Sequence, residues 1–345
     1  MHLTSDIVKE LNARLLKSLT LEYPVGLFWG KSGIAVYLYE LYGYTLDESY
    51  KHCADTILRS VIESGLTSDI GLSVSKGLTG IGLCIDYLVT KGYIEGDVNL
   101  LLSDIDSQLF KEINYNVDSH FTDVQTIQIL FYLYKRLQKK SSGNDIFIYS
   151  QAAYDLLNDL ASNLKADFFR EPYSSDIADY GVPILLKILS LYYLYPKFAP
   201  YRNRILKLLE LCSDNLFSHL PKRIFHRLFL YWGVVALRDL TPDWNAYVNL
   251  LKDNINIEHL VSDELKSHEI FLNNGLALIV FILSDLNKHF HDGSFEYDEE
   301  CLYTKMEESE VWGSLKDTWY FMSHRGLING YPGAILSLCA TSKHK

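Results

Sequence analysis

Apolar residues recur along this chain with helical spacing, in two patterns that alternate. Between Ile34 and Tyr42 they cover nearly every face of a helix, which is typical of a helix buried all round. Between Asp47 and Ser64 they occupy one side only, which predicts an amphipathic helix at a surface. The alternation continues along the chain, and few segments show the period of two that strands require. The pattern predicts an all-α protein.

Glycines stand at the starts of the predicted buried helices. Outside one gap of double length, they recur every 42 to 55 residues, three of them in a GxxG pattern and three alone (Gly30, Gly77 and Gly330; Gly181, Gly233 and Gly275). Residues 121–137 supply an apolar helix without the glycine inside that gap. A period of this length is typical of a helical repeat array. We expect one domain over residues 1–345, an α/α toroid of about seven helix pairs in two layers.

The buried helices of such a ring begin at one end, where their free N–H groups and positive dipole ends face a shared bowl. Glycine allows close backbone approach there. We therefore expect a ligand site at that end. Asp123, Asp176 and Asp179 come just before buried helices. They are either helix N-caps or candidates for carboxylate chemistry on a sugar or peptide.

Charge and cysteine content narrow the choice of partners and location. The formal net charge is −11, from 43 acidic and 32 basic residues, which disfavours nucleic acid and anionic membranes. The 25 tyrosines suit half-wet surfaces such as the wall of a cleft. Five scattered cysteines without a CxxC pair fit a reducing compartment. With no signal-peptide or membrane-spanning pattern visible, we expect a cytoplasmic protein.

Three segments resemble the GxxG repeats of the lanthionine synthetase C-like (LanC-like) family, namely GLFWGKSGIA (26–35), GLTGIG (77–82) and GLINGYPGA (326–334). The segment KGYIEGD (91–97) is similar to the short bacterial members of that family. The resemblance spans nearly the whole chain. It implies a ring of seven inner and seven outer helices. It also implies, for active members, a zinc ion held by two cysteines and a histidine that activates a peptide thiolate for thioether closure.

This sequence departs from the family pattern at the zinc ligands. The family's Trp-Cys-x-Gly is similar to residues 230–233, where Tyr231 replaces the cysteine and Trp232 follows it. Its Cys-His-Gly is similar to residues 273–275, where Asn273 and Asn274 replace both ligands. Tyr180 stands where active members carry a histidine before a glycine. Amides and a phenol are poor zinc ligands, so we expect no zinc-dependent cyclisation, no metal and no cofactor.

Two further groups of residues are candidates for chemistry. His289 and His291 with Asp292 offer metal-ligand spacing, although a solvated loop explains them as well. In a closed ring the first and last repeats adjoin, which would bring Trp29, His324, Arg325 and Tyr331 together. This cluster either binds a carboxylate, such as a peptide C-terminus, or seals the ring by stacking and ion pairing.

The sequence therefore predicts a LanC-like protein without the zinc site. It would act as a binding or accessory partner for a precursor peptide, or for a peptide-modifying enzyme, in bacterial ribosomal-peptide modification. A carboxylate-dependent enzyme of the same fold is the alternative. A structural interaction protein without a small-molecule site is the third possibility.

Overall fold

The computed structural model describes residues 6–19, 23–64, 70–115, 121–170, 176–266, 268–290 and 295–342. The described residues are helical throughout their regular parts and contain no strand. The chain divides into two compact units. Unit 1 consists of residues 1–108, 265–281 and 298–345, and unit 2 of residues 109–264 and 282–297. The organisation as a single domain stays a prediction.

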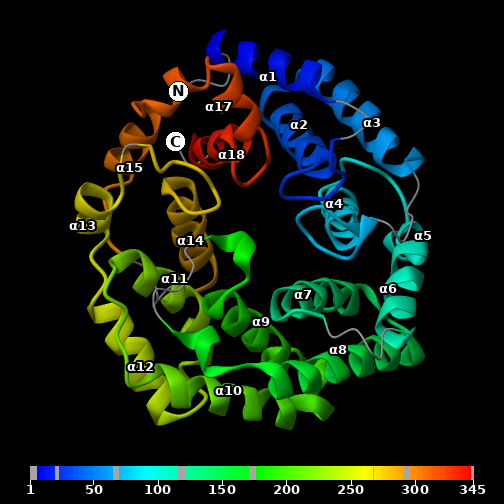
Figure 1. Ribbon diagram of the computed structural model, residues 1–345, viewed down its shortest axis with the longest axis vertical. Helices are drawn as coiled ribbons and strands as arrows, with labels where there is room; N and C mark the ends of the chain where they lie inside the picture. The colour runs from blue at the N-terminus through cyan, green and yellow to red at the C-terminus, as the bar shows by residue number, and fades with distance from the viewer. Residues whose placement is uncertain are drawn as a thin grey trace. The chain divides into compact units, whose positions relative to one another are not determined.

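Unit 1 contains both ends of the chain. Its helices are α1 (Asp6–Ser18), α2 (Lys31–Thr45), α3 (Glu48–Glu63), α4 (Leu78–Thr90), α5 (Val98–Leu101), α15 (Glu299–Glu307), α16 (Val311–Ser314), α17 (Thr318–Ser323) and α18 (Tyr331–Ser342). The helix α2 contacts α3, α4 and α18, so the first and last buried helices of the chain lie side by side (Figure 1). Because α2 is buried on nearly all faces and α3 on one, the two predicted helix types are confirmed here.

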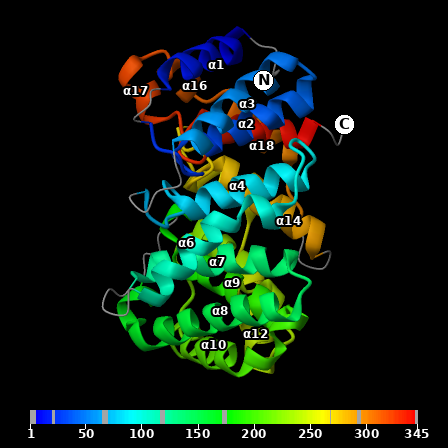
Figure 2. The same cartoon turned by 90° about the vertical axis from the view of Figure 1, so that its right-hand side faces the viewer.

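Unit 2 repeats this arrangement with the middle of the chain. Its elements are α7 (Asp123–Lys139), α8 (Gly143–Asn163), η2 (Ala166–Phe169), η3 (Ile177–Asp179), α9 (Val182–Leu194), η4 (Pro196–Tyr201), α10 (Arg202–Leu216), α11 (Ile224–Val234), η5 (Val235–Leu237), α12 (Pro242–Asp253), α13 (Ile257–His259) and η6 (Leu260–Glu264). The buried helices α7, α9 and α11 contact one another in that order. The helices α8, α10 and α12 cover them (Figure 1), and Figure 2 shows α8 beside α7 from another side.

Two helices contribute residues to both units, α6 (Ser103–Tyr115) and α14 (Leu276–His289). The predicted starts of five buried helices are confirmed, because Gly30, Gly77, Gly181, Gly275 and Gly330 each directly precede the first helical residue. The glycine-free helix predicted over 121–137 is confirmed as α7, which a Thr122 capping box starts instead.

The prediction that Gly233 opens a buried helix is wrong. The helix α11 begins at Ile224, and Gly233 lies one residue before its end. A Cβ on Gly233 would overlap the backbone carbonyl of Pro183, at the start of α9. The missing side chain of Gly233 therefore allows α9 and α11 to cross closely. At the true start of α11, the Glu264 carboxylate accepts hydrogen bonds from the amides of Ile224 (2.6 Å) and Phe225 (2.9 Å).

Candidate functional site

Four loops of unit 1 follow the same path before their helices. In each, the first helical amide donates a hydrogen bond to the carbonyl oxygen seven residues earlier, which satisfies an N–H group that the helix itself leaves free. The four pairs are Lys31 to Pro24 (2.8 Å), Leu78 to Gly71 (2.9 Å), Leu276 to Glu269 (2.8 Å) and Tyr331 to His324 (3.1 Å). The repeat recognised in the sequence is thus a repeat of backbone conformation.

The second glycine of each GxxG pattern is required by this loop. A Cβ on Gly33, Gly80 or Gly333 would overlap the carbonyl oxygen six residues earlier, on Leu27, Val74 and Leu327 respectively. The added atom on Gly33 would also meet Leu327, and the one on Gly333 would meet Leu272, both in a neighbouring loop. Only a residue without a side chain allows the helix to start this close to its own loop and to the next one.

Backbone hydrogen bonds join the four loops side by side. The amide of Leu27 donates to Val74 (3.0 Å), Ile328 donates to Phe28 (3.4 Å), and Asn273 donates to Ile328 (2.8 Å). The order in space is therefore the second, first, last and sixth repeat. The prediction that the first and last repeats adjoin is confirmed.

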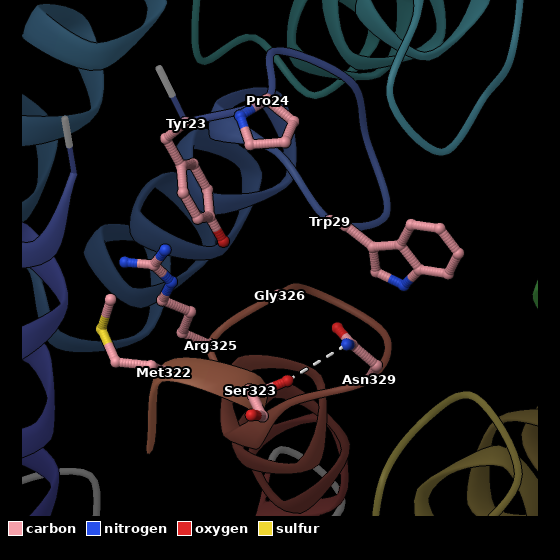
Figure 3. Close-up of a pocket in the computed structure, with 8 residues that line it drawn as sticks. All are labelled: Tyr23, Pro24, Trp29, Met322, Ser323, Arg325, Gly326 and Asn329. Carbon is pink, nitrogen blue, oxygen red and sulfur yellow. Dashed lines mark hydrogen bonds between the residues drawn. The ribbon is translucent and has the colours of Figure 1, made fainter. Parts of the chain in front are cut away.

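A cavity of about 320 Å³ opens where the first and last loops meet (Figure 3). It lies at the N-terminal ends of α2 and α18. Its lining residues are Tyr23, Pro24, Trp29, Met322, Ser323, Arg325, Gly326 and Asn329. Of the four residues predicted to cluster, Trp29 and Arg325 line this cavity.

Arg325 is the one charged residue in the described lining. Its Nη1 donates to the carbonyl oxygen of Ser18 (2.9 Å), and its guanidinium carbon lies 4.3 Å from the ring centroid of Tyr23. Burial raises the pKa of the Tyr23 phenol and the adjacent Arg325 opposes the rise, so the phenol stays a neutral donor at physiological pH. A guanidinium has five N–H donors; one donates to Ser18 and another to the Tyr23 hydroxyl, so the others remain for a ligand.

Two buried polar atoms of the lining have no hydrogen-bond partner. They are the indole Nε1 of Trp29, which is a donor, and the amide Oδ1 of Asn329, which is an acceptor. The Asn329 amide is oriented by its Nδ2, which donates to the Ser323 carbonyl (3.3 Å; Figure 3). The Lys76 ammonium lies 5.4 Å from the Trp29 ring centroid, which adds positive charge near the cavity. A buried donor and acceptor left unpaired each cost about 1–3 kcal/mol, and a ligand that paired both would recover this.

His324 and Tyr331 have packing roles beside the cavity. The His324 ring is stacked between Phe271 (centroids 4.8 Å apart) and Tyr320 (4.1 Å). The Tyr331 side chain is fully buried, and its hydroxyl donates toward the Leu11 carbonyl (3.1 Å) and Asn12 Oδ1 (3.2 Å). The prediction of a ligand-facing Tyr331 is therefore wrong, because this side chain seals the contact between α1 and α18.

Tyr231 and Trp232 are placed differently from the prediction. Both lie in the last turn of α11, away from its N-terminal end. Tyr231 packs edge-on against Phe295, and burial raises the pKa of its phenol to about 12. The indole Nε1 of Trp232 donates to Asp285 (2.7 Å), which also accepts from Lys187 (2.9 Å). The part of Tyr231 and Trp232 in a ligand site stays a prediction.

Tyr180 precedes α9 with a backbone φ of 48°, in the left-handed region that a bulky side chain rarely adopts. Burial raises the pKa of its phenol. In the loop before α14, Asn274 is exposed and Asn273 is half-buried. That Asn273, Asn274 and Tyr180 belong to a ligand site stays a prediction.

The three aspartates do not share one role. Asp176 caps η3 by accepting from the Ala178 amide (2.8 Å), as the capping interpretation predicts. Asp179 is the exposed last residue of η3, and Asp123 lies in the first turn of α7, where Thr122 is the cap. Neither Asp123 nor Asp179 is the N-cap residue of the helix that follows it, because Thr122 caps α7 and Gly181 stands at the N-cap of α9. With Asp176 engaged as a cap, the alternative of a carboxylate enzyme loses one of its three candidates.

No group of three or more His, Cys, Asp or Glu residues that could hold a metal ion occurs in the described part of the chain. The donor set that zinc requires is therefore not found there. His291 and Asp292 lie outside the described residues, and the absence of a zinc site stays a prediction. Among the helices described, none is long and apolar enough to cross a membrane.

Tyr23, Met322 and Asn329 were missed from the sequence. Asn329 stands directly before Gly330, as Trp29 stands before Gly30, so the position preceding the first glycine is a signal that could have found it. Tyr23 and Met322 carry no such signal, because they reach the cavity through the path of the loop and the short helix α17.

The helical repeats with glycine-rich loops at the helix starts are those of an α/α toroid, and a solved structure with this fold is similar to the chain. It is that of nisin cyclase, with a TM-score of 0.59 at 15% sequence identity. The match covers 99% of this chain and 94% of that one. No protein-family model and no curated protein matches the sequence. The fold class predicted from the sequence is confirmed.

Proposed function

We propose that this protein is a LanC-like protein that binds a peptide and serves as an accessory partner in bacterial ribosomal-peptide modification. The partner is a precursor peptide or a peptide-modifying enzyme. The observation that carries the proposal is the cavity between the first and last loops. It combines one cation, an unpaired donor and an unpaired acceptor with aromatic and apolar walls. Such a lining fits a peptide better than it fits a metal-assisted reaction.

Five other observations support this assignment. The similarity to nisin cyclase extends over nearly the whole chain, and the glycine loops before α2, α4 and α18 carry the segments that resemble the LanC-like repeats. The described residues provide no three-ligand metal cluster. All five cysteines are free thiols, which supports the cytoplasmic location that a precursor-binding protein would need. The net charge of −11 favours a basic partner over nucleic acid.

An affinity purification from the native host tests the accessory role. The tagged full-length protein is expected to recover a short precursor peptide or a peptide-modifying enzyme, identified by mass spectrometry. Arg325→Gln is expected to lose this partner, whereas the exposed Arg59→Gln retains it. Recovery of neither class of partner would contradict the proposal.

A second assay tests the non-catalytic part. The purified protein is incubated with zinc and a dehydrated cysteine-containing peptide, and thioether closure is followed by loss of the free thiol. We expect no closure above the rate without protein. Zinc-dependent closure would show that a ligand set exists and that the protein is a cyclase.

A further inference from the structure

The unpaired groups of the cavity form a pattern that specifies its ligand more closely. Figure 3 shows Tyr23 and Arg325 on one side of the cavity and Trp29 with Asn329 on the other. The first side offers the remaining donors of a guanidinium beside a neutral phenol. The second offers one buried N–H donor and one buried oxygen acceptor. A ligand that satisfied both sides would carry an anion at one end and a donor–acceptor pair next to it.

A carboxylate is the anion that fits the first side. Guanidinium groups bind carboxylates by two parallel hydrogen bonds, and the described lining contains no acidic side chain to compete. Arg325 is held in place by Ser18 and by the ring of Tyr23, so little side-chain entropy would be lost on binding.

A peptide bond is the neighbouring group that fits the second side. It has one N–H donor and one carbonyl acceptor. Both atoms are covered in the free protein, so the Trp29 and Asn329 side chains must rotate toward the ligand; the N–H can then donate to Asn329 Oδ1, and the carbonyl can accept from Trp29 Nε1. A carboxylate next to a peptide bond is the C-terminal residue of a peptide.

An apolar surface continues from the cavity onto α17. Met322 lines the cavity and is 44% exposed, and Trp319, one helical turn earlier, is 76% exposed. Residues three apart on a helix lie on the same face. This face can cover an apolar side chain of the bound peptide, and charge complementarity at Arg325 sets the direction of the chain.

We propose that the cavity binds the free C-terminus of a peptide with an apolar last side chain. The carboxylate lies on Arg325 and Tyr23, the last peptide bond lies between Trp29 and Asn329, and the side chain lies on Met322. This inference rests on the proposed peptide-binding function and names the part of the peptide that is recognised.

Fluorescence anisotropy with short probes tests the inference. The probes are fluorescein-labelled Gly-Gly-Leu with a free carboxylate and the same peptide as a C-terminal amide. We expect the amide to bind at least tenfold more weakly, since it removes the charge that Arg325 would pair with. Arg325→Gln is expected to weaken the acid about tenfold and to abolish its advantage over the amide. The exposed Arg59→Gln serves as the matched control and leaves both Kd values unchanged.

If Arg325→Gln does not fold, Trp29→Phe is the second variant that tests the inference. It retains an aromatic ring near Lys76 and removes only the indole N–H, with an expected fivefold loss of affinity for the acid.

Equal binding of acid and amide, or binding of neither probe at millimolar concentration, would overturn the inference. If a precursor peptide is nevertheless captured from the host, the accessory function stands and only the C-terminal recognition fails. If the acid binds but no precursor or modifying enzyme is captured, the cavity is a carboxylate site and the accessory role fails.

Discussion

Asn12 holds together the contact between the first and last parts of the chain. It is 3% exposed in α1, and its Oδ1 accepts from the hydroxyls of Tyr37 (2.8 Å) and Tyr331 (3.2 Å). Both tyrosine rings are fully buried and meet edge-on with centroids 6.0 Å apart. We predict that Asn12→Leu, which keeps the branched shape of the side chain but has no acceptor, lowers the free energy of unfolding of this part of the protein.

The expected magnitude follows from the groups left unpaired. Tyr37 loses the acceptor of its hydroxyl in a site without solvent, and a buried hydroxyl without a partner costs about 1–3 kcal/mol. Tyr331 keeps the Leu11 carbonyl, so its loss is smaller, about 0.5 kcal/mol. We expect a total of about 1.5–3.5 kcal/mol.

Urea unfolding followed by circular dichroism measures this change. If two transitions are seen, only one should shift, because Asn12, Tyr37 and Tyr331 all belong to unit 1. Asn249→Leu, at an exposed position of α12 in unit 2, is the control and should change stability by less than about 0.5 kcal/mol.

A double variant separates desolvation from packing. In Asn12→Leu with Tyr37→Phe, the unpaired hydroxyl is gone, and replacing both partners of a buried hydrogen bond by apolar groups is nearly neutral. The double variant should recover about 1–2 kcal/mol relative to Asn12→Leu. If it is no more stable than the single variant, the reasoning from unpaired hydroxyls is refuted.

Three further predictions concern other parts of the fold. Gly33→Ala should lower stability by about 2–3 kcal/mol, because its Cβ would overlap a backbone carbonyl, whereas Gly143→Ala, with open space around it, should be nearly neutral in thermal unfolding. Burial pushes the pKa of Asp285 upward, but Lys187, the Trp232 hydrogen bond and His289 together outweigh this and lower it. Asp285 therefore stabilises the fold above the ordinary Asp pKa near 4 and loses this effect as the pH falls below it. Asp285→Asn should therefore flatten the loss of stability seen in acid titrations and cost about 1–2 kcal/mol at neutral pH. Glu264→Ala should cost about 1 kcal/mol through the lost cap of α11, and an unchanged melting temperature would contradict that role.

The positions of most buried helices could be predicted because their signals are local. Gly30 and Gly77 adopt extended N-cap conformations, and the apolar run after each is long enough to define a helix. The glycine-free start of α7 was found from the same apolar run, since hydrophobic periodicity does not depend on the cap.

Gly233 shows where a local signal is ambiguous. A glycine next to an apolar run marks either a helix start or a close crossing of two helices, and the residues beside it are the same in both cases. Only the distance to Pro183 separates the two. The carboxylate that caps α11 comes from Glu264, 40 residues away along the chain, and no local pattern predicts such a partner.

The candidate site was predicted in part for the same reason. Trp29 and Arg325 could be named together because the repeat implied that the first and last loops meet. Tyr331 stands within the GxxG motif of the last repeat, but its side chain turns into the core, where Asn12 supplies an acceptor.

The sequence by itself determined the helical class, the repeat, and the glycine loops before α2, α4, α14 and α18, because periodicity and the absence of a Cβ act over a few residues. Only the tertiary structure decided which polar atoms remain unpaired, as at Trp29 and Asn329. A hydrogen-bond partner is set by distance in space, and loops some 300 residues apart in the chain meet at this cavity.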